Sequence, residues 1–468
     1  MISRRTALIA GGGTAAVLAG GAAAVAVANR DKPEPPSPPS TDGKGHTLWR
    51  NWSGIEHSYP VRRAAPGDAG ELADLLKAAP TPVRVTGAGH SFTGLCATDG
   101  TLVSLDAMSG VTRWDGEAAV VRAGTRLGAL GPALAERGRA MANLPDINKQ
   151  SLGGALGTAT HGTGRDLKAI HGDVTALTLV TAEGEIIDCD ARRRPEIFQA
   201  ARVSLGALGI IAEARLETTA NRRLRRRVWI EPFEAALEKA EERWAAHRNF
   251  EFYAVPFTGL AVGISHDETD DPATPRPPSQ DDAFLKALMS LRNLLGFSTG
   301  LRRAAAKAML AGLEPEVVVD EGWKLLSTER PVRFNEIEYH LPVEAQLTAL
   351  KSVVGVIEKA RPDVFFPIEV RRIAPDDAWL SPFQGGPRGS IAVHAHYKDD
   401  HDFFATLIEP VFRRHGGRPH WGKLHSLRGP DLAALYPRWG DFLALRRELD
   451  PQGRLLNPYL KSLFGAAV

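Results

Sequence analysis

Cysteine is scarce in this chain: its 468 residues include two, Cys96 and Cys189. Two thiols cannot build a disulfide framework or a multi-cysteine zinc site. An excess of one charge is also lacking, because 57 Lys and Arg residues face 55 Asp and Glu residues, for a net charge of +2. A dedicated nucleic-acid binder would need a clear basic excess for its phosphate contacts. We therefore expect no nucleic-acid partner.

The chain nevertheless has the composition of a folded globular protein. Hydrophobic residues make up 43% and charged residues 24%, which excludes a largely disordered chain. The length corresponds to two large domains or about three smaller ones. The 46 glycines are the most informative feature, because several lie close together, and glycine lets a backbone approach a ligand closely.

The first 28 residues have the features of an export signal. Arg4 and Arg5 precede an Ala/Gly/Val run over 6–28, and Ala26-Val27-Ala28 offers a small-residue cleavage site. The start is similar to a twin-arginine signal, although Ala7 stands where Phe is usual. The alternative is a retained anchor, because an apolar run of about 20 residues can span a bilayer. We expect an exported, periplasmic or extracytoplasmic protein whose only membrane contact would be an anchor over 6–28.

The rest of the chain divides into a spacer and two structured parts. The proline-rich segment 29–46 predicts an extended spacer. Short strands then alternate with helices to about Thr219, which is typical of an α+β or α/β domain. The basic run 222–227 leads into the second part, and the balanced net charge favours a solvated strand there over a phosphate or membrane contact. Helices are expected over 68–78 (with Asp68 as N-cap), 127–137, 233–246 and 285–295, and strands over 83–85, 101–105, 118–123, 176–181, 335–341, 365–371 and 390–397.

A glycine-rich turn follows the expected strand 83–85. Its residues are Gly87, Ala88, Gly89, His90 and Ser91. Backbone N–H groups in such a turn can cradle an anion. The spacing is not that of the Rossmann fingerprint, because the next glycine is Gly94. His90 is the informative residue, since it is held close to whatever the turn binds.

A second stretch of small residues, 151–164, lies further along the chain. Its backbone can pack flat against a planar or pyrophosphate ligand. Two separate cradles predict a large two-ended ligand such as a dinucleotide, and 204–211 adds a glycine-spaced turn that enters an apolar strand. The candidate contact residues of the stretch are Ser151, Gly153, Gly154, Gly157, Thr158, His161 and Gly162.

Charged side chains occur in apolar surroundings in the C-terminal half. Period-two alternation puts Glu369 and Arg371 on one face of the expected strand 365–371. Their apolar neighbours argue against an ordinary ion pair on a wet surface. Lys423 ends the string RPHWGK, which begins at Arg418.

Histidines in the same half leave a metal site open as an alternative. His394 and His396 share a strand face, and His420 lies in the RPHWGK string. No acidic triad lies near them in the sequence. We therefore expect polar histidines that line a site, and no metal.

The three glycine-rich motifs together resemble the FAD-binding domain of the vanillyl-alcohol oxidase superfamily. Within it, they are most similar to the sugar-1,4-lactone and alditol oxidase group. The resemblance implies that His90 bonds covalently to the 8α-methyl group of FAD. It also implies that the residues of both cradles, together with Ile211 and Lys423, contact the cofactor. The Glu369–Arg371 pair matches the substrate-binding E-x-R of the group, and the RPHWGK string matches its HWGK signature.

The resemblance also implies an architecture, here an α+β fold. A PCMH-type FAD-binding domain would cover 47–221, and a substrate or cap domain with an antiparallel sheet would cover 222–440. The segment 441–468 would return to the FAD-binding domain. One position departs from the group: His396 stands where alditol oxidases have a substrate-contacting Thr. The identity of the substrate therefore cannot be carried over.

The activity implied is FAD-dependent oxidation of a carbinol in a sugar lactone, alditol or related polyol. Hydride would pass to flavin N5, with Glu369, Arg371, Lys423 and His396 as the catalytic set. Arg371 and Lys423 would stabilise the developing alkoxide. Reoxidation by O₂ would give hydrogen peroxide. The alternatives are a flavin dehydrogenase with another electron acceptor, an NADPH-dependent reductase, an exported electron carrier, and a metallohydrolase built on His394, His396 and His420.

Overall fold

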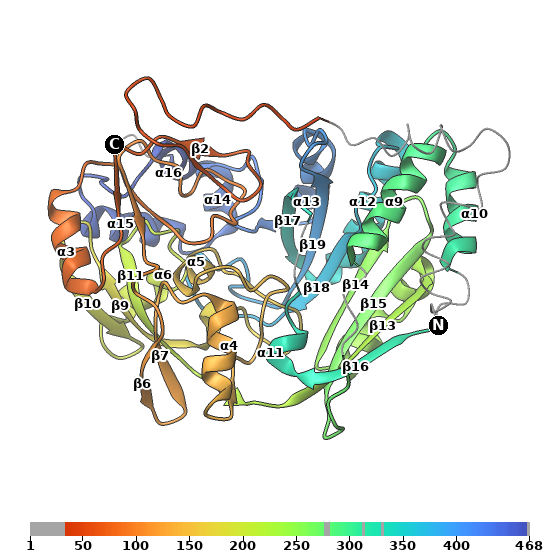
Figure 1. Ribbon diagram of the computed structural model, residues 1–468, viewed down its shortest axis with the longest axis horizontal. Helices are drawn as coiled ribbons and strands as arrows, with labels where there is room; N and C mark the ends of the chain where they lie inside the picture. The colour runs from red at the N-terminus through yellow and green to blue at the C-terminus, as the bar shows by residue number, and fades with distance from the viewer. Residues whose placement is uncertain (1–32, 276–280, 311–313, 329–331, 466–468) are drawn as a thin grey trace.

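The computed structural model describes residues 33–275, 281–310, 314–328 and 332–465. Within them, strands from 62–216 form the larger sheets of one part, and strands from 223–419 form an eight-stranded sheet in the other. The two parts lie side by side (Figure 1). Helices occur together with parallel and antiparallel sheets, so the α+β prediction is confirmed. The predicted signal or anchor over 1–28 lies outside the described residues.

The first part contains two sheets of different kinds. A parallel sheet has the order β3 (Arg62–Ala64), β5 (Thr101–Ser104), β4 (Val83–Thr86). An antiparallel sheet has the order β10 (Ile186–Asp190), β9 (Val174–Val180), β11 (Ile210–Leu216), β7 (Ala118–Arg122), β6 (Val111–Asp115). Two short pairs join β1 (Trp49–Arg50) to β2 (His57–Ser58) and β8 (Arg139–Ala140) to β12 (Thr219–Ala220). The helices are α3 (Ala69–Ala78), α4 (Leu127–Ala135), α5 (Leu152–Gly157) and α6 (Pro195–Ala201), with a 3-10 turn at Ile170–Asp173.

The helix α3 shows how local sequence sets these boundaries. The Asp68 side chain accepts a hydrogen bond from the Glu71 amide, which makes Asp68 the N-cap as predicted. Leu72, Leu75 and Leu76 lie on the buried face. An amphipathic stripe of this kind holds a short helix against the sheets.

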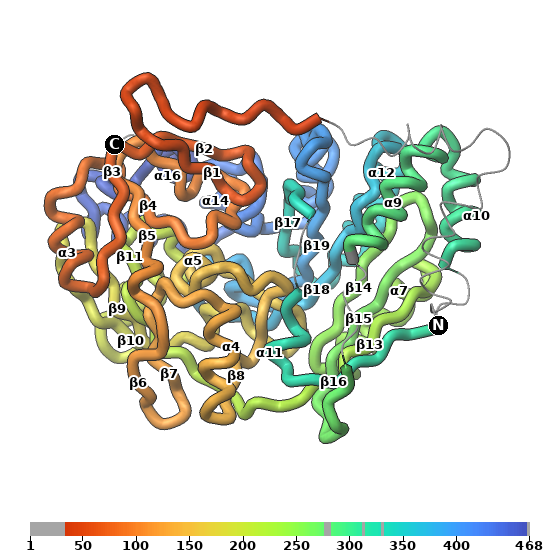
Figure 2. Tube along the Cα trace, in the orientation of Figure 1, coloured from red at the N-terminus to blue at the C-terminus, as the bar shows by residue number. Residues whose placement is uncertain are grey.

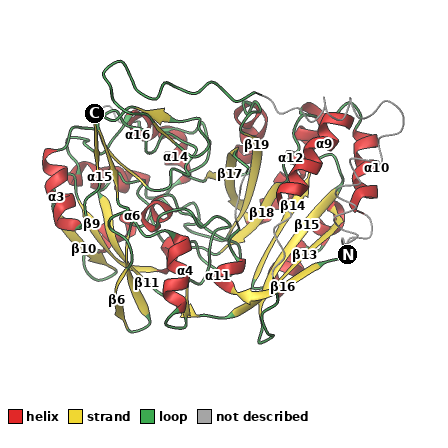
Figure 3. Cartoon of the chain, in the orientation of Figure 1, coloured by secondary structure: helices red, strands yellow, loops and turns green. Residues whose placement is uncertain are grey.

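The second part is built on an eight-stranded antiparallel sheet. Its order is β16 (Glu316–Glu321), β13 (Arg223–Pro232), β15 (Leu260–Glu268), β14 (Asn249–Val255), β18 (Ile368–Ile373), β19 (Arg388–His396), β17 (Phe334–Pro342), β20 (Arg418–Pro419). The helices of this part are α7 (Phe233–Glu238), α8 (Ala240–Ala246), α9 (Asp281–Leu295), α10 (Thr299–Leu310), α11 (Gly322–Leu325), α12 (Val343–Ala360) and α13 (Glu409–Arg414), with a π-helical turn at Phe404–Ile408. Figure 3 shows the long strands of this sheet beside the shorter strands and loops of the first part.

Several predicted elements differ in detail from the structure. The helix expected over 233–246 is interrupted at Lys239, where α7 ends and α8 begins. The strand expected from Phe365 begins at Ile368, because Pro367 has no N–H to donate to a ladder. The basic run forms the start of β13, where Arg226 lies 3.0 Å from Glu316 and Arg225 pairs with Asp271. Arg223, Arg225 and Arg227 are exposed, which agrees with the predicted solvated strand, whereas Arg226 is partly buried.

The C-terminal helices lie against the first part of the molecule. They are α14 (Gly429–Leu435), α15 (Trp439–Leu449) and α16 (Pro458–Phe464), drawn blue in Figure 1. The buried guanidinium of Arg84, on β4, donates to the carbonyl oxygens of Leu95, Leu205 and Leu455 at 2.7 Å each. Asn457 donates to the carbonyl of Gly94, also at 2.7 Å. These bonds join the end of the chain to the glycine-rich loops.

The segment that precedes β1 connects the two parts. The red tube of Figure 2 runs along one edge of the molecule from residue 33. Near its start, the Glu34 carboxylate lies 3.1 Å from Arg333 and 3.2 Å from Lys398, both in the second part. The Tyr59 hydroxyl, in the first part, donates to the Pro39 carbonyl at 2.9 Å. The described part of the predicted spacer therefore contacts the second part through Glu34 and the first part through Pro39.

Membrane-spanning helices are absent from the described ranges: none of the helices there is both long and apolar enough to cross a bilayer.

Candidate functional site

A cavity of about 1520 Å³, solvent at its mouth included, runs between the glycine-rich loops of the first part and the edge of the eight-stranded sheet. It brings the two predicted cradles together. The predicted cofactor residues that line it are Gly87, Ala88, Gly89, His90, Ser91, Ser151, Gly153, Gly154, Gly157, Thr158, His161, Ile211 and Lys423. Gly162 does not line it, because this glycine packs against Asn143 and the carbonyl of Leu144.

The two cradles are in close contact at Gly87. A Cβ atom on Gly87 would lie 2.1 Å from the Ser151 hydroxyl oxygen. Gly89 has a φ of +68°, in the left-handed region that favours glycine. The turn before His90 therefore packs closely against the second cradle at Gly87 and favours glycine for its backbone conformation at Gly89.

His90 lies on the cavity wall with its ring stacked on Trp52. The ring centroids are 5.1 Å apart and the planes differ by 30°. Burial, together with the nearby cations Lys423 and Arg126, lowers the pKa of His90 to about 4. The imidazole is therefore neutral at pH 7 and keeps a nitrogen lone pair, as a nucleophile requires.

The residues along this cavity fit a large cofactor with a planar end. The side-chain oxygen of Gln150, which lines the cavity, is buried and has no hydrogen-bond partner in the protein. A Cβ atom at Gly157 would meet no atom within 4 Å, so the backbone there faces open space. Polar atoms that lack a partner and backbone that lies open are what a bound dinucleotide would use.

A second cavity, of about 1290 Å³ with its open mouth included, lies against one face of the eight-stranded sheet. The opposite face carries α12, whose Gln346 side chain donates to the Arg371 carbonyl at 2.8 Å. The two cavities meet, because they share the lining residues Asp146, Ile147, Phe334, Glu336, Arg371 and Lys423. A ligand in the second cavity therefore reaches the cofactor cavity directly.

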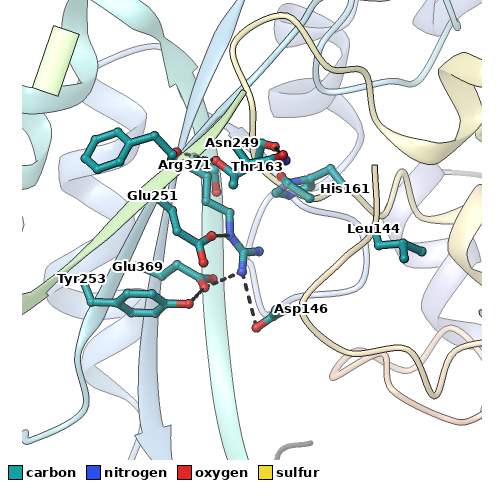
Figure 4. Close-up of polar contacts among 12 residues, drawn as sticks. Leu144, Asp146, His161, Thr163, Asn249, Glu251, Tyr253, Glu369 and Arg371 are labelled. Carbon is teal, nitrogen blue, oxygen red and sulfur yellow. Dashed lines mark hydrogen bonds and ion pairs between the residues drawn. The ribbon is translucent and has the colours of Figure 1, made fainter. Parts of the chain in front are cut away.

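Arg371 is the centre of a group of carboxylates in the second cavity (Figure 4). Its Nε lies 2.8 Å from Glu251, and one terminal nitrogen lies 3.4 Å from Asp146 and also contacts Glu369. The Tyr253 hydroxyl donates to Glu369. Burial alone would lower the pKa of Arg371, but the three carboxylates outweigh it and raise the pKa well above its usual value. Glu369 and Arg371 thus share a face, as the strand periodicity predicts.

Lys423 lies where the two cavities meet and forms an ion pair with Glu336. Burial opposes its charge, but the carboxylates of Glu336 and Glu338 raise the pKa of Lys423 above its ordinary value. The ammonium group therefore stays charged at neutral pH. His394 also approaches Glu336, with Nε2 3.7 Å from a carboxylate oxygen.

The two histidines of β19 occupy different positions. His394 lines the second cavity. His396 lines neither cavity, and its ring packs near Phe365, Phe366 and Tyr397 instead. The structure therefore brings Glu369, Arg371 and Lys423 together and places His396 apart from them.

A buried polar group beside the cofactor cavity was not predicted. Glu338 lies 3.0 Å from His161 Nε2, and His161 Nδ1 lies 2.9 Å from the Gly162 carbonyl. Burial would raise the pKa of Glu338, but its histidine neighbours, His161 first, lower it well below the usual value. The signal was present in the expected strand 335–341, where Glu336, Glu338 and His340 alternate.

The histidine set considered for a metal does not come together. Among the described residues, His161, Glu338 and His420 bring candidate ligand atoms within 4.8 Å of one another. His394 and His396 are not part of that group. The metallohydrolase alternative thus lacks the His394–His396–His420 site that it requires.

Comparison with known proteins agrees with this geometry. The family model for D-arabinono-1,4-lactone oxidase matches residues 214–463, which is more than half of the chain, and an FAD binding domain matches residues 60–190. The chain belongs to the D-arabinono-1,4-lactone oxidase family. Because both of its domains match, the protein is an FAD-dependent oxidoreductase, as predicted.

Relatives of this family member span nearly the whole chain. L-gulono-1,4-lactone dehydrogenase of Mycobacterium tuberculosis is 33% identical over 431 residues, which cover 89% of this chain and 99% of the relative. Alditol oxidase of a Streptomyces species is 30% identical, and L-gulonolactone oxidase of Bos taurus is 29% identical, each again over 89% of this chain. These two alignments cover 99% and 98% of the relatives.

Proposed function

We propose that the protein oxidises a carbinol of a sugar lactone, alditol or related polyol, with FAD attached covalently through His90 and O₂ as the electron acceptor. The observation that carries the proposal is the junction of the two cavities at Arg371 and Lys423. One cavity holds the residues that resemble an FAD site, and the other presents carboxylates and cations to a polar substrate. An electron carrier would have no need of the second cavity.

The chain's own residues divide the work at this junction. Bound FAD supplies the hydride acceptor. Glu369, oriented by Tyr253 and Arg371, offers carboxylate oxygens that accept hydrogen bonds from substrate hydroxyls. Glu369 is also our candidate base for the hydroxyl proton. Lys423 stabilises the negative charge that develops on the substrate oxygen.

Anaerobic bleaching of the flavin tests the substrate class. A panel of aldonolactones, alditols and simple sugars is mixed with the yellow holoenzyme without oxygen, and the visible absorbance is followed. At least one lactone or alditol should bleach the flavin. If none does, the proposed substrate class is wrong. Air is then admitted: rapid return of the colour with formation of hydrogen peroxide supports an oxidase, and slow return that an artificial acceptor accelerates supports a dehydrogenase.

We further propose that the protein is exported, on the basis of the twin-arginine-like pattern in residues 1–28. In a bacterial host, the wild-type protein should be recovered outside the cytoplasm. Replacing both Arg4 and Arg5 by Lys should retain it in the cytoplasm. Wild-type protein that stays in the cytoplasm contradicts export, whereas export in a form that sediments with membranes supports the anchor over cleavage.

A further inference from the structure

The second cavity has an excess of negative groups. The carboxylates of Asp146, Glu251, Glu336 and Glu369 line it together with two cations, Arg371 and Lys423. Four carboxylates against two cations leave a formal net charge of −2 in this group of residues, of which Asp146, Glu336, Arg371 and Lys423 also line the cofactor cavity. Arg226 and Asp282 also line the cavity, but each forms an ion pair, with Glu316 at 3.0 Å and with Lys286 at 2.7 Å, and together they add no net charge.

Arg371 is already neutralised by its neighbours. One guanidinium charge faces the carboxylates of Glu251, Asp146 and Glu369. Glu251 and Glu369 are nearly as buried as Arg371, with exposed fractions of 8%, 5% and 5%. Charges that are shielded from solvent interact strongly with an incoming ligand, because little water screens them. An anionic ligand therefore meets net repulsion here, although two cations are present.

The hydrogen-bonding capacity of the cavity also favours a neutral ligand over an anionic one. An ionised carboxylate only accepts hydrogen bonds. The hydroxyl groups of a neutral polyol can donate to Asp146, Glu251 and Glu369. A ligand carboxylate or phosphate dianion offers no donor in return, so it would bury unpaired acceptors against acceptors.

We propose that Glu251 and Asp146 are specificity-determining residues that make this cavity select uncharged polyhydroxylated ligands and reject anionic ones. The inference rests on the proposed function and sharpens it: the closed lactone binds, and the open-chain aldonate formed from it by hydrolysis does not. Glu251 reaches the site from β14 and Asp146 from a loop of the first part (Figure 4). Both parts of the molecule thus contribute to the selection.

The test compares an aldonolactone that the enzyme oxidises with the aldonate of the same carbon chain. Binding of the aldonate to the anaerobic holoenzyme is read from the change in the flavin spectrum, and binding of the lactone from the concentration dependence of bleaching. We expect the aldonate to bind about 10²-fold more weakly than the lactone, since like charges at a buried site cost several kcal/mol. In Glu251→Gln, the ratio of the aldonate Kd to the lactone Kd should fall about tenfold, because one buried negative charge is removed.

Two further variants keep the outcome decisive. Asp146→Asn removes a charge from a partly exposed side chain and should tighten aldonate binding in the same direction, even if Glu251→Gln does not fold. Glu117→Gln removes one negative charge from an exposed residue in the first part and should leave the ratio of the two affinities unchanged. Equal affinities for lactone and aldonate in the wild type, or a ratio that neither cavity variant changes, would overturn the inference.

Failure of the proposed function has a different signature. In that case no lactone or alditol bleaches the flavin, and the lactone and the aldonate are both titrated through the flavin spectrum. Tighter binding of the lactone would still support charge selection by the cavity, and equal binding would still reject it.

Discussion

His90→Ala should abolish covalent attachment of the flavin. Wild-type protein precipitated with acid should keep its yellow colour in the pellet, whereas the variant should release essentially all of its flavin to the supernatant. The physical reason is the position of His90 on the cavity wall with a ring that is neutral at pH 7. His90 would supply the neutral nitrogen for a bond to the 8α-carbon of FAD, and the electron acceptor would have to take up the two electrons that this bond formation releases with two protons.

The pH dependence of attachment follows from the same group. The pKa of His90 is lowered to about 4, so the neutral, nucleophilic form predominates above that pH and is lost as the pH falls through it. Attachment of FAD to apoprotein should therefore proceed at a constant rate from about pH 8 to pH 5 and slow near pH 4. The rate is measured as the yellow fraction in acid pellets over time.

His57→Ala is the matched control for this experiment. His57 is an exposed histidine that does not line the cavity, so its loss should leave the pellet yellow. Flavin that remains bound in the acid pellet of His90→Ala would show that another residue forms the bond. A colourless pellet from yellow wild-type protein would show that the cofactor is not covalent.

Lys423→Gln should slow flavin reduction by about 10² to 10³-fold, the usual cost of removing one preorganised group that stabilises developing charge. Burial opposes the charge of the wild-type Lys423 side chain, but Glu336 and Glu338 raise its pKa. The side chain therefore carries its charge throughout the neutral range. Glutamine keeps a donor for Glu336 but removes the charge. The rate is measured by anaerobic stopped-flow absorbance at saturating substrate.

Two substitutions separate the effect of charge from a loss of structure. Lys423→Arg keeps the charge and should recover part of the rate. Lys239→Gln changes an exposed lysine between α7 and α8. The flavin of this control variant should be reduced at the wild-type rate. If Lys423→Gln reduces its flavin at a rate within about threefold of the wild type, the effect of the substitution is too small for the electrostatic role, and the prediction is wrong.

Motifs that act through their own backbone could be read from the sequence. The turn at Gly87–His90 and the stretch from Ser151 are each one continuous segment of the chain, and both line the cofactor cavity. Their chemistry depends on small residues and on a histidine that follows directly, which are local properties. Gly162 was the exception, because its packing against Asn143 depends on a segment outside the motif.

Strand periodicity predicted a face but not the partners on it. Alternation placed Glu369 and Arg371 on one side of β18, and the structure agrees. It could not show that Arg371 would meet Glu251, which lies 120 positions away, or that His394 rather than His396 would line the second cavity. Those outcomes depend on which strands become neighbours in the sheet.

The sequence alone was therefore sufficient for the two cradles and for the position of His90 beside one of them, since local backbone requirements specify them. The pattern of strands and helices left α+β and α/β open, and the resemblance of the motifs to the oxidase group implied α+β. The electrostatic character of the substrate cavity required the folded chain. Asp146, Glu251 and Glu336 come from a loop and two strands that are distant in sequence, and charges interact through space. The sequence predicted that the cations Arg371 and Lys423 belong to the site. The fold brings carboxylate partners to both of them, and the net charge of the cavity is therefore negative.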